Sequence, residues 1–272
     1  MRIIKPVADF PANSTIRTGF VPTMGALHEG HISLIKRSRS ENDRTVVSIF
    51  VNPTQFGPNE DLSKYPRPFE RDCEMASEAG ADIVFAPSVE DVYKENSSKI
   101  QVPHVTELYE GAHRPGHFDG VATIVAKLFN IVTPNTAYFG EKDLQQCAVV
   151  TKLVEDLNFR IKIIFCDTIR ENDGLAKSSR NTYLNEHDRL LAPCLHQALM
   201  QAKDDLLNGK KSSLTLKEQI EFLKSNSFNV DYFDLVDRST MHPIRELNDN
   251  ASLIVAAKLG TTRLIDNVRV IG

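Results

Sequence analysis

Residues 19–35 read Gly19-Phe20-Val21-Pro22-Thr23-Met24-Gly25-Ala26-Leu27-His28-Glu29-Gly30-His31-Ile32-Ser33-Leu34-Ile35. Phe20 and Val21 are typical of the end of a buried strand, and Pro22 is expected to stop that strand because proline lacks a backbone donor. Gly25 and Gly30 allow the backbone to turn tightly and to approach a ligand closely. The apolar residues that follow suit one buried stripe of a helix. The segment therefore predicts a strand, a glycine-containing turn and the start of a helix.

The start of this helix is a candidate anion site. Free backbone N–H groups and the helix dipole point outward from a helix N-terminus. His28 and His31 are three residues apart and lie on nearly the same side of the first turn. Imidazole donors there can neutralise charge that builds up on a phosphate during transfer. Two alternatives stay open for this pair: a metal site, and a capped helix with two surface histidines.

The composition is that of an ordinary soluble protein. The chain has 272 residues, of which 41% are hydrophobic and 25% charged, and it suits one large domain or two smaller ones. The net charge of -4 gives no overall field to recruit nucleic acid, so no nucleic-acid partner is expected. Four cysteines without a C-x-x-C pair favour a reducing, cytoplasmic location. No run approaches the ~20 apolar residues of a membrane span, so no membrane association is expected.

A second buried strand is predicted at residues 44–51, a near-continuous apolar and β-branched run. Such runs are typical of parallel sheets, in which ligands bind beyond the carboxyl ends of the strands. Asn52 and Gln55 follow this strand directly, and their side chains are candidates for binding a substrate hydroxyl or carboxylate. For Asn52, ordinary turn chemistry is the alternative.

The rest of the first two-thirds of the chain alternates between helices and strands. Helices are predicted at residues 69–79 and 121–132, and strands at residues 82–87, 99–102, 136–139 and 160–167. Residues 110–120 hold three glycines, two histidines and an arginine, which indicates a mobile loop that meets an anion, or a flexible connector. The alternation predicts an α/β fold.

Two further segments carry chemistry suited to phosphates. Residues 140–143 are expected to begin a helix with Lys142 in its first turn, where a cation opposes the helix dipole and a bound phosphate would resolve the conflict. Gln146 lies on the same face as Lys142. Residues 177–180, Lys-Ser-Ser-Arg, place two cations and two hydroxyls on one short loop, which suits a triphosphate. A solvated lysine and a solvated basic patch are the respective alternatives.

The last third of the chain has a different pattern. A long helix at residues 186–208 and a second at 215–225 precede three strand-like runs at residues 230–236, 253–258 and 262–270. Helices followed by short strands, without alternation, predict a small α+β domain.

Five stretches, in order along the chain, resemble the pantothenate synthetase (pantoate–β-alanine ligase) family, which belongs to the HIGH-motif nucleotidylyltransferases. They are residues 20–34, residues 48–61 with Tyr65-Pro66-Arg67, and residues 114–128, 138–146 and 169–184. The tetrapeptide His28-Glu29-Gly30-His31 stands for the HIGH motif, and Lys177-Ser178-Ser179-Arg180 stands for the KMSKS-like motif. Residues 262–267 also resemble the family's ending.

The resemblance implies a Rossmann-like parallel-sheet domain at residues 1–168 and a smaller C-terminal α+β domain at residues 169–272 that carries the KMSKS-like loop. It also implies a two-step reaction. ATP and pantoate give pantoyl adenylate and pyrophosphate, and the amine of β-alanine then attacks the acyl carbon to release pantothenate and AMP. The small-molecule partners are therefore expected to be pantoate, β-alanine and ATP, with Mg²⁺ required. A homodimer is expected because the family is usually dimeric.

The same resemblance implies the residues of the ATP site. Among them, Ile169 matches a position whose backbone contacts adenine. The expected set is Met24, Gly25, Ala26, Leu27, His28, Glu29, Gly30, His31, Gly140, Glu141, Lys142, Asp143, Ile169, Lys177, Ser178, Ser179 and Arg180. Catalytic roles fall to His28, His31, Lys142 and Arg180. His31 matches the usual proton donor, although we expect neutralisation of the pyrophosphate leaving group to be its larger role. Lys177 replaces a frequent methionine and adds a charge near the expected triphosphate.

The pantoate site is expected to contain Gln55 and Gln146, because amide side chains both donate and accept, with Asn52 nearby. Asp72 is expected on the side of the magnesium ion. Arg71 stands where relatives often have an acidic residue, and this departure weakens the metal role of Asp72.

Three rival functions are weaker. Another HIGH-type adenylyltransferase that uses a phosphate acceptor would need extra cations where Gln55 and Gln146 stand. An ATP-binding regulatory module would not need the intact His28 and His31. An RNA-charging enzyme is disfavoured because the chain is acidic overall and has no obvious basic stripe.

Overall fold

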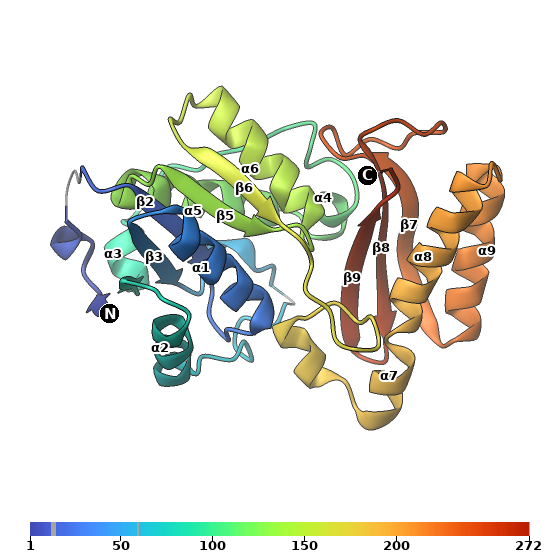
Figure 1. Cartoon of the computed structure of the whole chain (residues 1–272), viewed down its shortest axis with the longest axis horizontal. Coiled ribbons are helices and arrows are strands. Elements are labelled where there is room, and N and C mark those ends of the chain that lie inside the picture. Colours follow the sequence, from blue (N-terminus) through green and yellow to red (C-terminus); the bar gives the residue numbers. More distant parts are fainter. Residues whose placement is uncertain (12–14, 59, 272) are drawn as a thin grey trace. The chain divides into compact units, whose positions relative to one another are not determined.

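The structure is a computed structural model that describes residues 1–11, 15–58 and 60–271. The chain forms two compact units (Figure 1). The first comprises Met1–Glu141 with Val149–Asp167, and the second comprises Lys142–Ala148 with Thr168–Gly272. Each unit has its own β-sheet.

A parallel β-sheet forms the centre of the first unit. Within the described residues it has six strands in the order β1-β4-β3-β2-β5-β6, and every pairing is parallel. The strands are β1 (Arg2–Ile4), β2 (Thr18–Thr23), β3 (Arg44–Ile49), β4 (Ile83–Phe85), β5 (Thr136–Gly140) and β6 (Lys162–Cys166). The order reverses at β2, because the chain proceeds to β3 and β4 on one side and to β5 and β6 on the other. Ligands of parallel α/β sheets bind beyond the carboxyl ends of the strands at such a point.

Helices cover both faces of this sheet (Figure 1). The helices of the first unit are η1 (Val7–Asp9), α1 (Glu29–Glu41), η2 (Pro53–Gln55), α2 (Phe69–Glu78), α3 (Val89–Val92), α4 (Glu110–His113), α5 (His117–Val132) and α6 (Leu144–Asp156), whose first turn belongs to the second unit. Val21 of β2 shares a buried core with Ile35 of α1. The ring of the preceding Phe20 instead lies 6.4 Å from that of Phe129 in α5. Since successive strand residues point to opposite faces, α1 and α5 lie on opposite sides of β2. The Rossmann-like α/β fold is confirmed.

The prediction that Pro22 ends its strand is wrong, because β2 continues to Thr23. The carbonyl of Thr23 accepts a hydrogen bond from Phe50 N–H on the β3 side, at 3.1 Å. Backbone groups alternate in direction along a strand, so Pro22 faces the β5 side. Within the described residues, the β5 ladder pairs with Gly19 and Phe20 and stops short of Pro22. A proline is tolerated in a strand where no ladder bond is required of its nitrogen.

Two other segments of the first unit differ from prediction. Residues 99–102, predicted as an edge strand, have no regular structure, and β1 provides the edge beside β4 instead. Residues 110–120, predicted as a loop, are largely helical, because α4 lies within them and α5 already begins at His117. Gly116 makes the turn between these helices with a left-handed φ of 80°, which glycine adopts without strain.

The second unit packs helices against an antiparallel sheet. Within the described residues the sheet has the order β7-β8-β9, with β7 (Phe228–Asp237), β8 (Ala251–Leu259) and β9 (Thr262–Arg269). The helices are η3 (Ser179–Tyr183), α7 (Glu186–Leu191), α8 (Cys194–Leu207) and α9 (Ser212–Ser225). Leu199 of α8, Leu223 of α9 and Leu253 of β8 are completely buried in one core. The prediction of a smaller α+β region at the C-terminal end is confirmed.

The long helix predicted at residues 186–208 is two helices. α7 ends at Leu191 and α8 begins at Cys194, with Pro193 between them. Inside a continuous helix, Pro193 would remove a hydrogen bond and its ring would clash with the carbonyl four residues earlier. The chain therefore breaks the helix at this residue.

Candidate active site

A tight turn joins β2 to α1. Gly25 and Ala26 are both left-handed, with φ of 86° and 49°. The backbone N–H groups of Ala26 and Leu27 donate to the Asp72 carboxylate of α2, at 2.8 Å to Oδ2 and 2.7 Å to Oδ1. A Cβ atom on Gly25 would lie 2.8 Å from Asp72 Oδ2, so this position requires glycine for space as well as for its φ. Asp72 thus holds the path of the chain into α1.

Asp72 is almost completely buried, with 1% of its surface exposed. Burial raises the pKa of its carboxyl group, and the hydrogen bonds from Leu27 and Ala26 act in the opposite direction. Both carboxylate oxygens are engaged by the backbone of the turn. Over residues 1–11, 15–58 and 60–271, no group of three or more His, Cys, Asp or Glu side chains is placed to hold a metal ion.

His28 and His31 form a capping box at the start of α1. His28 Nδ1 accepts a hydrogen bond from Gly30 N–H at 3.1 Å, and His31 Nδ1 accepts one from His28 N–H at 3.3 Å. The ring centroids lie 4.2 Å apart, and both residues are partly exposed. Because each Nδ1 accepts, each neutral ring carries its proton on Nε2. The pair therefore caps the helix and also places imidazole N–H donors at its N-terminus.

Gln55 lies in η2, just beyond the carboxyl end of β3, and is 8% exposed. Its Nε2 group donates to Met24 Sδ at 3.0 Å, and its Oε1 accepts from Asn52 Nδ2 at 3.1 Å. Asn52, 1% exposed, also donates to Gly120 O at 3.1 Å and accepts from Tyr93 OH at 2.8 Å. The structure thus brings Met24 and Gln55 together. It uses Asn52 to hold Gln55, which favours the turn-chemistry interpretation of that asparagine.

His117, at the start of α5, and Arg114, just after α4, support the same turn. His117 Nδ1 donates to Gln55 O at 2.8 Å, and Arg114 Nη1 donates to His117 Nε2 at 3.0 Å. Arg114 also forks onto Glu60, with bonds of 2.8 and 2.6 Å. Burial first, and then the charge of Arg114, lowers the pKa of His117 to about 4, so its ring is neutral at pH 7. Sequence reasoning assigned these residues to a loop. The apolar residues Phe118, Val121, Ala122 and Val125 recur at helical spacing, and this was the signal that a helix begins near His117.

The segment after β5 is divided between the two units. Glu141 N–H donates to Cys166 O at 2.9 Å, which ties the end of β5 to β6 in the first unit. Lys142 and Asp143 belong to the second unit and precede α6. The prediction that Lys142 lies in the first helical turn is therefore corrected. Its Nζ atom is 3.9 Å from Asp143 Oδ1, and the half-buried Gln146 lies in the first turn of α6 instead.

Ile169 and Lys177 pair across a short hairpin of the second unit. Lys177 N–H donates to Ile169 O at 2.9 Å, and Arg170 forms an antiparallel bridge with Ala176. Lys177 Nζ lies 2.9 Å from Glu171 Oε2. The extra positive charge at position 177 is thus paired with a carboxylate of the same hairpin.

The serine and arginine residues of the KMSKS-like motif follow this hairpin directly. Ser178 Oγ accepts from Arg180 N–H at 3.3 Å and caps η3. Asn181 Nδ2 donates to Ala176 O at 3.0 Å, which fastens the motif to the hairpin. Ser178, Ser179 and Arg180 are all partly buried.

The structure places the predicted site residues in two sets, one in each unit. The first unit holds Met24, Gly25, Ala26, Leu27, His28, Glu29, Gly30, His31, Asn52, Gln55, Asp72, Gly140 and Glu141. The second unit holds Lys142, Asp143, Gln146, Ile169, Lys177, Ser178, Ser179 and Arg180.

The sheet order around β2 and the capped helix that follows it define a Rossmann-like α/β protein, a class that binds nucleotides at helix starts of this kind. A profile of the family described as pantoate-beta-alanine ligase matches residues 3–269. The chain belongs to this pantoate–β-alanine ligase family, whose members are also named pantothenate synthetases, and it is an enzyme.

Individual relatives agree with this family over nearly their whole length. The pantothenate synthetase of Caldicellulosiruptor saccharolyticus is 50% identical over 253 residues, which cover 92% of this chain and 90% of the relative. The crystal structure of the Thermus thermophilus pantothenate synthetase has a TM-score of 0.96 and 46% identity, with all of both chains covered. That of the Francisella tularensis pantoate-beta-alanine ligase, complexed with beta-gamma ATP and beta-alanine, has a TM-score of 0.85 and 38% identity, with 99% and 98% covered.

Proposed function

We propose that this chain ligates pantoate to β-alanine through a pantoyl-adenylate intermediate. A carboxylate oxygen of pantoate attacks the α-phosphorus of ATP, and pyrophosphate leaves. The amine of β-alanine then attacks the acyl carbon, the acyl–oxygen bond to AMP breaks, and pantothenate forms with loss of a proton from nitrogen. The capping box of His28 and His31 is the observation that carries this proposal, because it sets imidazole donors where a phosphate would bind.

His28 and His31 stabilise the negative charge that develops on the departing pyrophosphate. Their Nδ1 atoms accept from backbone N–H groups at the start of α1, which orients both rings and puts the proton of each neutral ring on Nε2. Preorganised donors of this kind need little rearrangement during the reaction. Met24 through His31 line the ATP site.

Pantoate binds to the amide groups of Gln55 and Gln146, which can pair with both its hydroxyl groups and its carboxylate. Gln55 is suited to this role because Asn52 and His117 hold its side chain and its carbonyl. Asn52 is accordingly a supporting residue of the pantoate site.

In the second unit, Lys142 and the segment from Ser178 to Arg180 bind the phosphates of ATP. Arg180 supplies a forked donor and Lys142 a point charge. Gly140 to Asp143 and Ile169 complete the ATP site, and the backbone of Ile169 is the part that meets adenine. Lys177 contributes less charge than its sequence suggests, because Glu171 is its partner.

Mg²⁺ is expected to accompany ATP. It is usually held by one or two carboxylates together with substrate phosphates. Within the part of the chain that the structure describes, the acidic side chains do not build a dedicated metal cluster, and Asp72 already holds the β2–α1 turn. Asp72 therefore does not fit a metal ligand.

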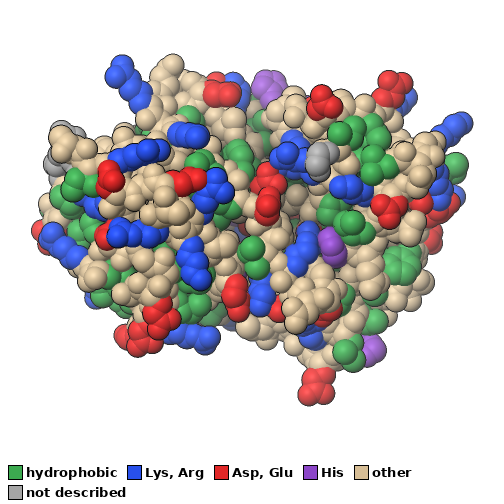
Figure 2. Space-filling view, in the orientation of Figure 1, with side chains coloured by type: hydrophobic (Ala, Val, Ile, Leu, Met, Phe, Trp, Pro, Cys, Tyr) green, Lys and Arg blue, Asp and Glu red, His purple; other side chains and the backbone are tan. Residues whose placement is uncertain are grey.

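A cytoplasmic homodimer without nucleic-acid or membrane partners completes the proposal. On the face shown in Figure 2, lysine and arginine side chains are interspersed with acidic ones, a pattern that offers no continuous basic stripe there. Among the helices built from described residues, none combines the length and hydropathy that crossing a membrane demands.

Release of pyrophosphate and AMP tests the proposed reaction. The enzyme is mixed with ATP, Mg²⁺ and pantoate, with and without β-alanine. A single burst of pyrophosphate without β-alanine, followed by steady AMP release once it is added, is the expected result. Pyrophosphate release that does not depend on pantoate would indicate another adenylyltransferase. The absence of any release would indicate an ATP-binding module without catalysis.

A further inference from the structure

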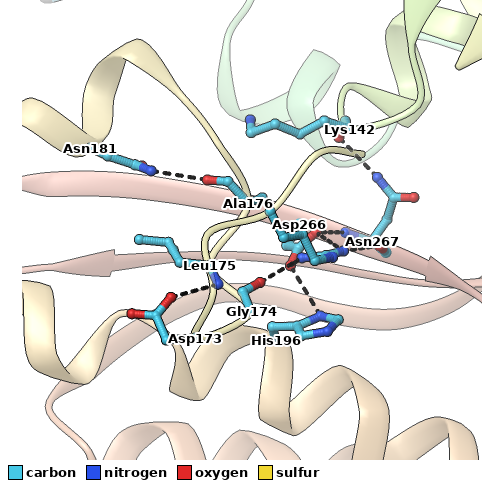
Figure 3. A network of polar contacts seen from close by, with 10 residues as sticks. Lys142, Asp173, Gly174, Leu175, Ala176, Asn181, His196, Asp266 and Asn267 are labelled. Carbon is cyan, nitrogen blue, oxygen red and sulfur yellow. Dashed lines mark hydrogen bonds and ion pairs between the residues drawn. The ribbon is translucent and has the colours of Figure 1, made fainter. Parts of the chain in front are cut away.

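Asp266 of β9 is a buried carboxylate that has no role in the reaction described above. Its side chain is 2% exposed, and Arg170 forks onto it at 2.6 Å to Oδ2 and 3.0 Å to Oδ1. His196 Nδ1 lies 3.6 Å from Oδ2 (Figure 3). Burial alone would raise the pKa of Asp266, but the polar groups of His196 and Arg170 outweigh it and lower that pKa. The cluster is therefore a charged carboxylate beneath a bidentate arginine.

Arg170 extends this cluster into the hairpin that precedes the KMSKS-like motif. Its Nη1 group also donates to Gly174 O at 3.0 Å, and its Nη2 group to Asn267 O at 3.3 Å. Gly174 has a φ of 95°, and a Cβ atom there would lie 2.8 Å from His196 Cδ2. The tip of the hairpin is thus seated on the Asp266 cluster with no room for a side chain.

The hairpin is also linked to the segment from Ser178 to Arg180, which is proposed to bind phosphates. The backbone of Arg170 forms a β-bridge with that of Ala176 across the hairpin. Asn181 Nδ2 donates to Ala176 O at 3.0 Å (Figure 3). Ser178 to Arg180 lie between these two attachments. Arg170 is therefore linked to this segment through Ala176.

The same strand also holds the second phosphate-binding segment. Asn267 N–H donates to Asp266 Oδ1 at 2.8 Å, and Asn267 Nδ2 donates to the carbonyl of Lys142 at 2.9 Å (Figure 3). Consecutive residues of β9 thus bind the hairpin on one side and the backbone of Lys142 on the other.

We propose that Asp266 and Arg170 are positioning residues that set the spacing between Lys142 and the Ser178–Arg180 segment for adenylate formation. The inference rests on the proposed function, since it concerns where the phosphates of ATP are held. Removing a bidentate contact lets the supported groups drift, and a misplacement of ~1 Å can cost about 100-fold in rate. A lysine at position 170 keeps the charge but cannot reproduce the fork onto both oxygens of Asp266.

Step-resolved kinetics of Arg170→Ala and Arg170→Lys test this role. Pantoate-dependent pyrophosphate release reports the first step, and the β-alanine dependence of AMP release reports the second. We expect the first-step rate to fall about 100-fold in Arg170→Ala and the KM for ATP to rise severalfold. The KM for β-alanine should change less than about twofold, because the amine reacts after pyrophosphate has left. Guanidinium ion at low, non-denaturing concentration should restore part of the Arg170→Ala rate.

Arg189→Ala is the matched control. Arg189 pairs with Asp173 of the same hairpin at 2.6 Å, but these side chains are 36% and 41% exposed and lie outside the Asp266 cluster. This variant should keep the wild-type first step and should not respond to guanidinium.

The outcomes separate the positioning role of Arg170 from the proposed function. A folded Arg170→Ala protein that behaves like Arg189→Ala, or that loses both steps equally without rescue, overturns the positioning role. If Arg170→Ala does not fold, Asp266→Asn and Asn267→Ser take its place. These variants should also raise the KM for ATP and leave the KM for β-alanine nearly unchanged. Wild-type protein without pantoate-dependent pyrophosphate release overturns the proposed function itself, and this inference with it.

Discussion

His117 uses both nitrogens of a neutral ring. Nδ1 donates to Gln55 O, and Nε2 accepts from Arg114. A protonated ring could not accept that second bond and would place its charge against the guanidinium of Arg114. The turn that holds Gln55 therefore depends on this histidine remaining neutral.

Lowering the pH should destabilise the protein through His117. Its folded-state pKa of about 4 lies below the ordinary 6.5, so the unfolded chain binds a proton that the folded chain does not, and stability falls between these values as pH decreases. The shift corresponds to about 3 kcal/mol. The pH dependence of the free energy of unfolding can be measured by urea unfolding of the wild type and of His117→Asn. The asparagine amide keeps a donor for Gln55 O. The wild type should lose more stability from pH 7 to pH 4, and equal losses would contradict the assignment.

His31 has a capping role and a proposed catalytic role that mutation can separate. His31→Ala should lower the rate of adenylate formation at least about tenfold, because a donor aimed at the leaving group is lost. His31→Gln keeps an acceptor at the third helical position, which suits a capping box, but lacks the imidazole. The glutamine variant should therefore unfold like the wild type and still react slowly. Wild-type rates in either variant would remove His31 from the mechanism.

At the scale of elements, the β2–α1 turn depends on a side chain from α2. Asp72 accepts two backbone N–H groups of that turn, and two consecutive left-handed residues bring those groups together. A left-handed residue other than glycine, such as Ala26, persists only where its surroundings impose it. The left-handed turn between β2 and α1 is thus stabilised by a side chain of α2.

Asp72→Asn should weaken the turn. The amide nitrogen would face a backbone N–H, and leaving that buried donor unsatisfied costs about 1–3 kcal/mol. We expect lower stability and a higher KM for ATP, measured by urea unfolding and by initial rates. The Mg²⁺ concentration that gives half-maximal rate should not change. A variant that requires much more Mg²⁺ but keeps wild-type stability would instead place Asp72 beside the metal ion.

The contact between α5 and η2 is the second interface between elements that bears on the site. A Cβ atom on Gly120 would lie 2.5 Å from Thr54 O and 2.6 Å from Gln55 N. Gly120→Ala should therefore push η2 away, with a loss of about 1–3 kcal/mol in stability and a higher KM for pantoate. Gly57→Ala is the control, because its Cβ would meet Glu60 at an ordinary 3.6 Å. Equal kinetics of the two variants would show that Gln55 does not depend on this packing.

At the scale of the whole molecule, the expected homodimer can be tested by mass. One chain has a mass of 30.5 kDa, so the proposed dimer should sediment as a particle of twice that mass. Sedimentation equilibrium over a range of protein concentrations measures it. A single species with the mass of one chain would show that the protein is a monomer.

The sequence predicted most of the secondary structure, and its errors have physical causes. The apolar run at residues 44–51 was a reliable sign of β3, because a strand buried on both faces needs apolar residues throughout. The prediction that Pro22 ends its strand was wrong, because a strand tolerates proline where the neighbouring ladder of hydrogen bonds has already ended. His117 misled because glycines and histidines are common in loops, while burial of this histidine depends on packing against η2.

By itself the sequence determined the α/β character of the first two-thirds, the α+β character of the rest, and the HIGH- and KMSKS-like motifs, because these depend on local residue patterns. The tertiary structure alone decided that Asp72 holds the β2–α1 turn, that Asn52 and His117 hold Gln55, and that Asp266 supports Arg170. The contacts of Asp72, His117 and Asp266 join residues of different elements, whereas the bond from Asn52 to Gln55 is local to η2. Local periodicity carries no information about which elements meet, so only the packed chain could reveal them.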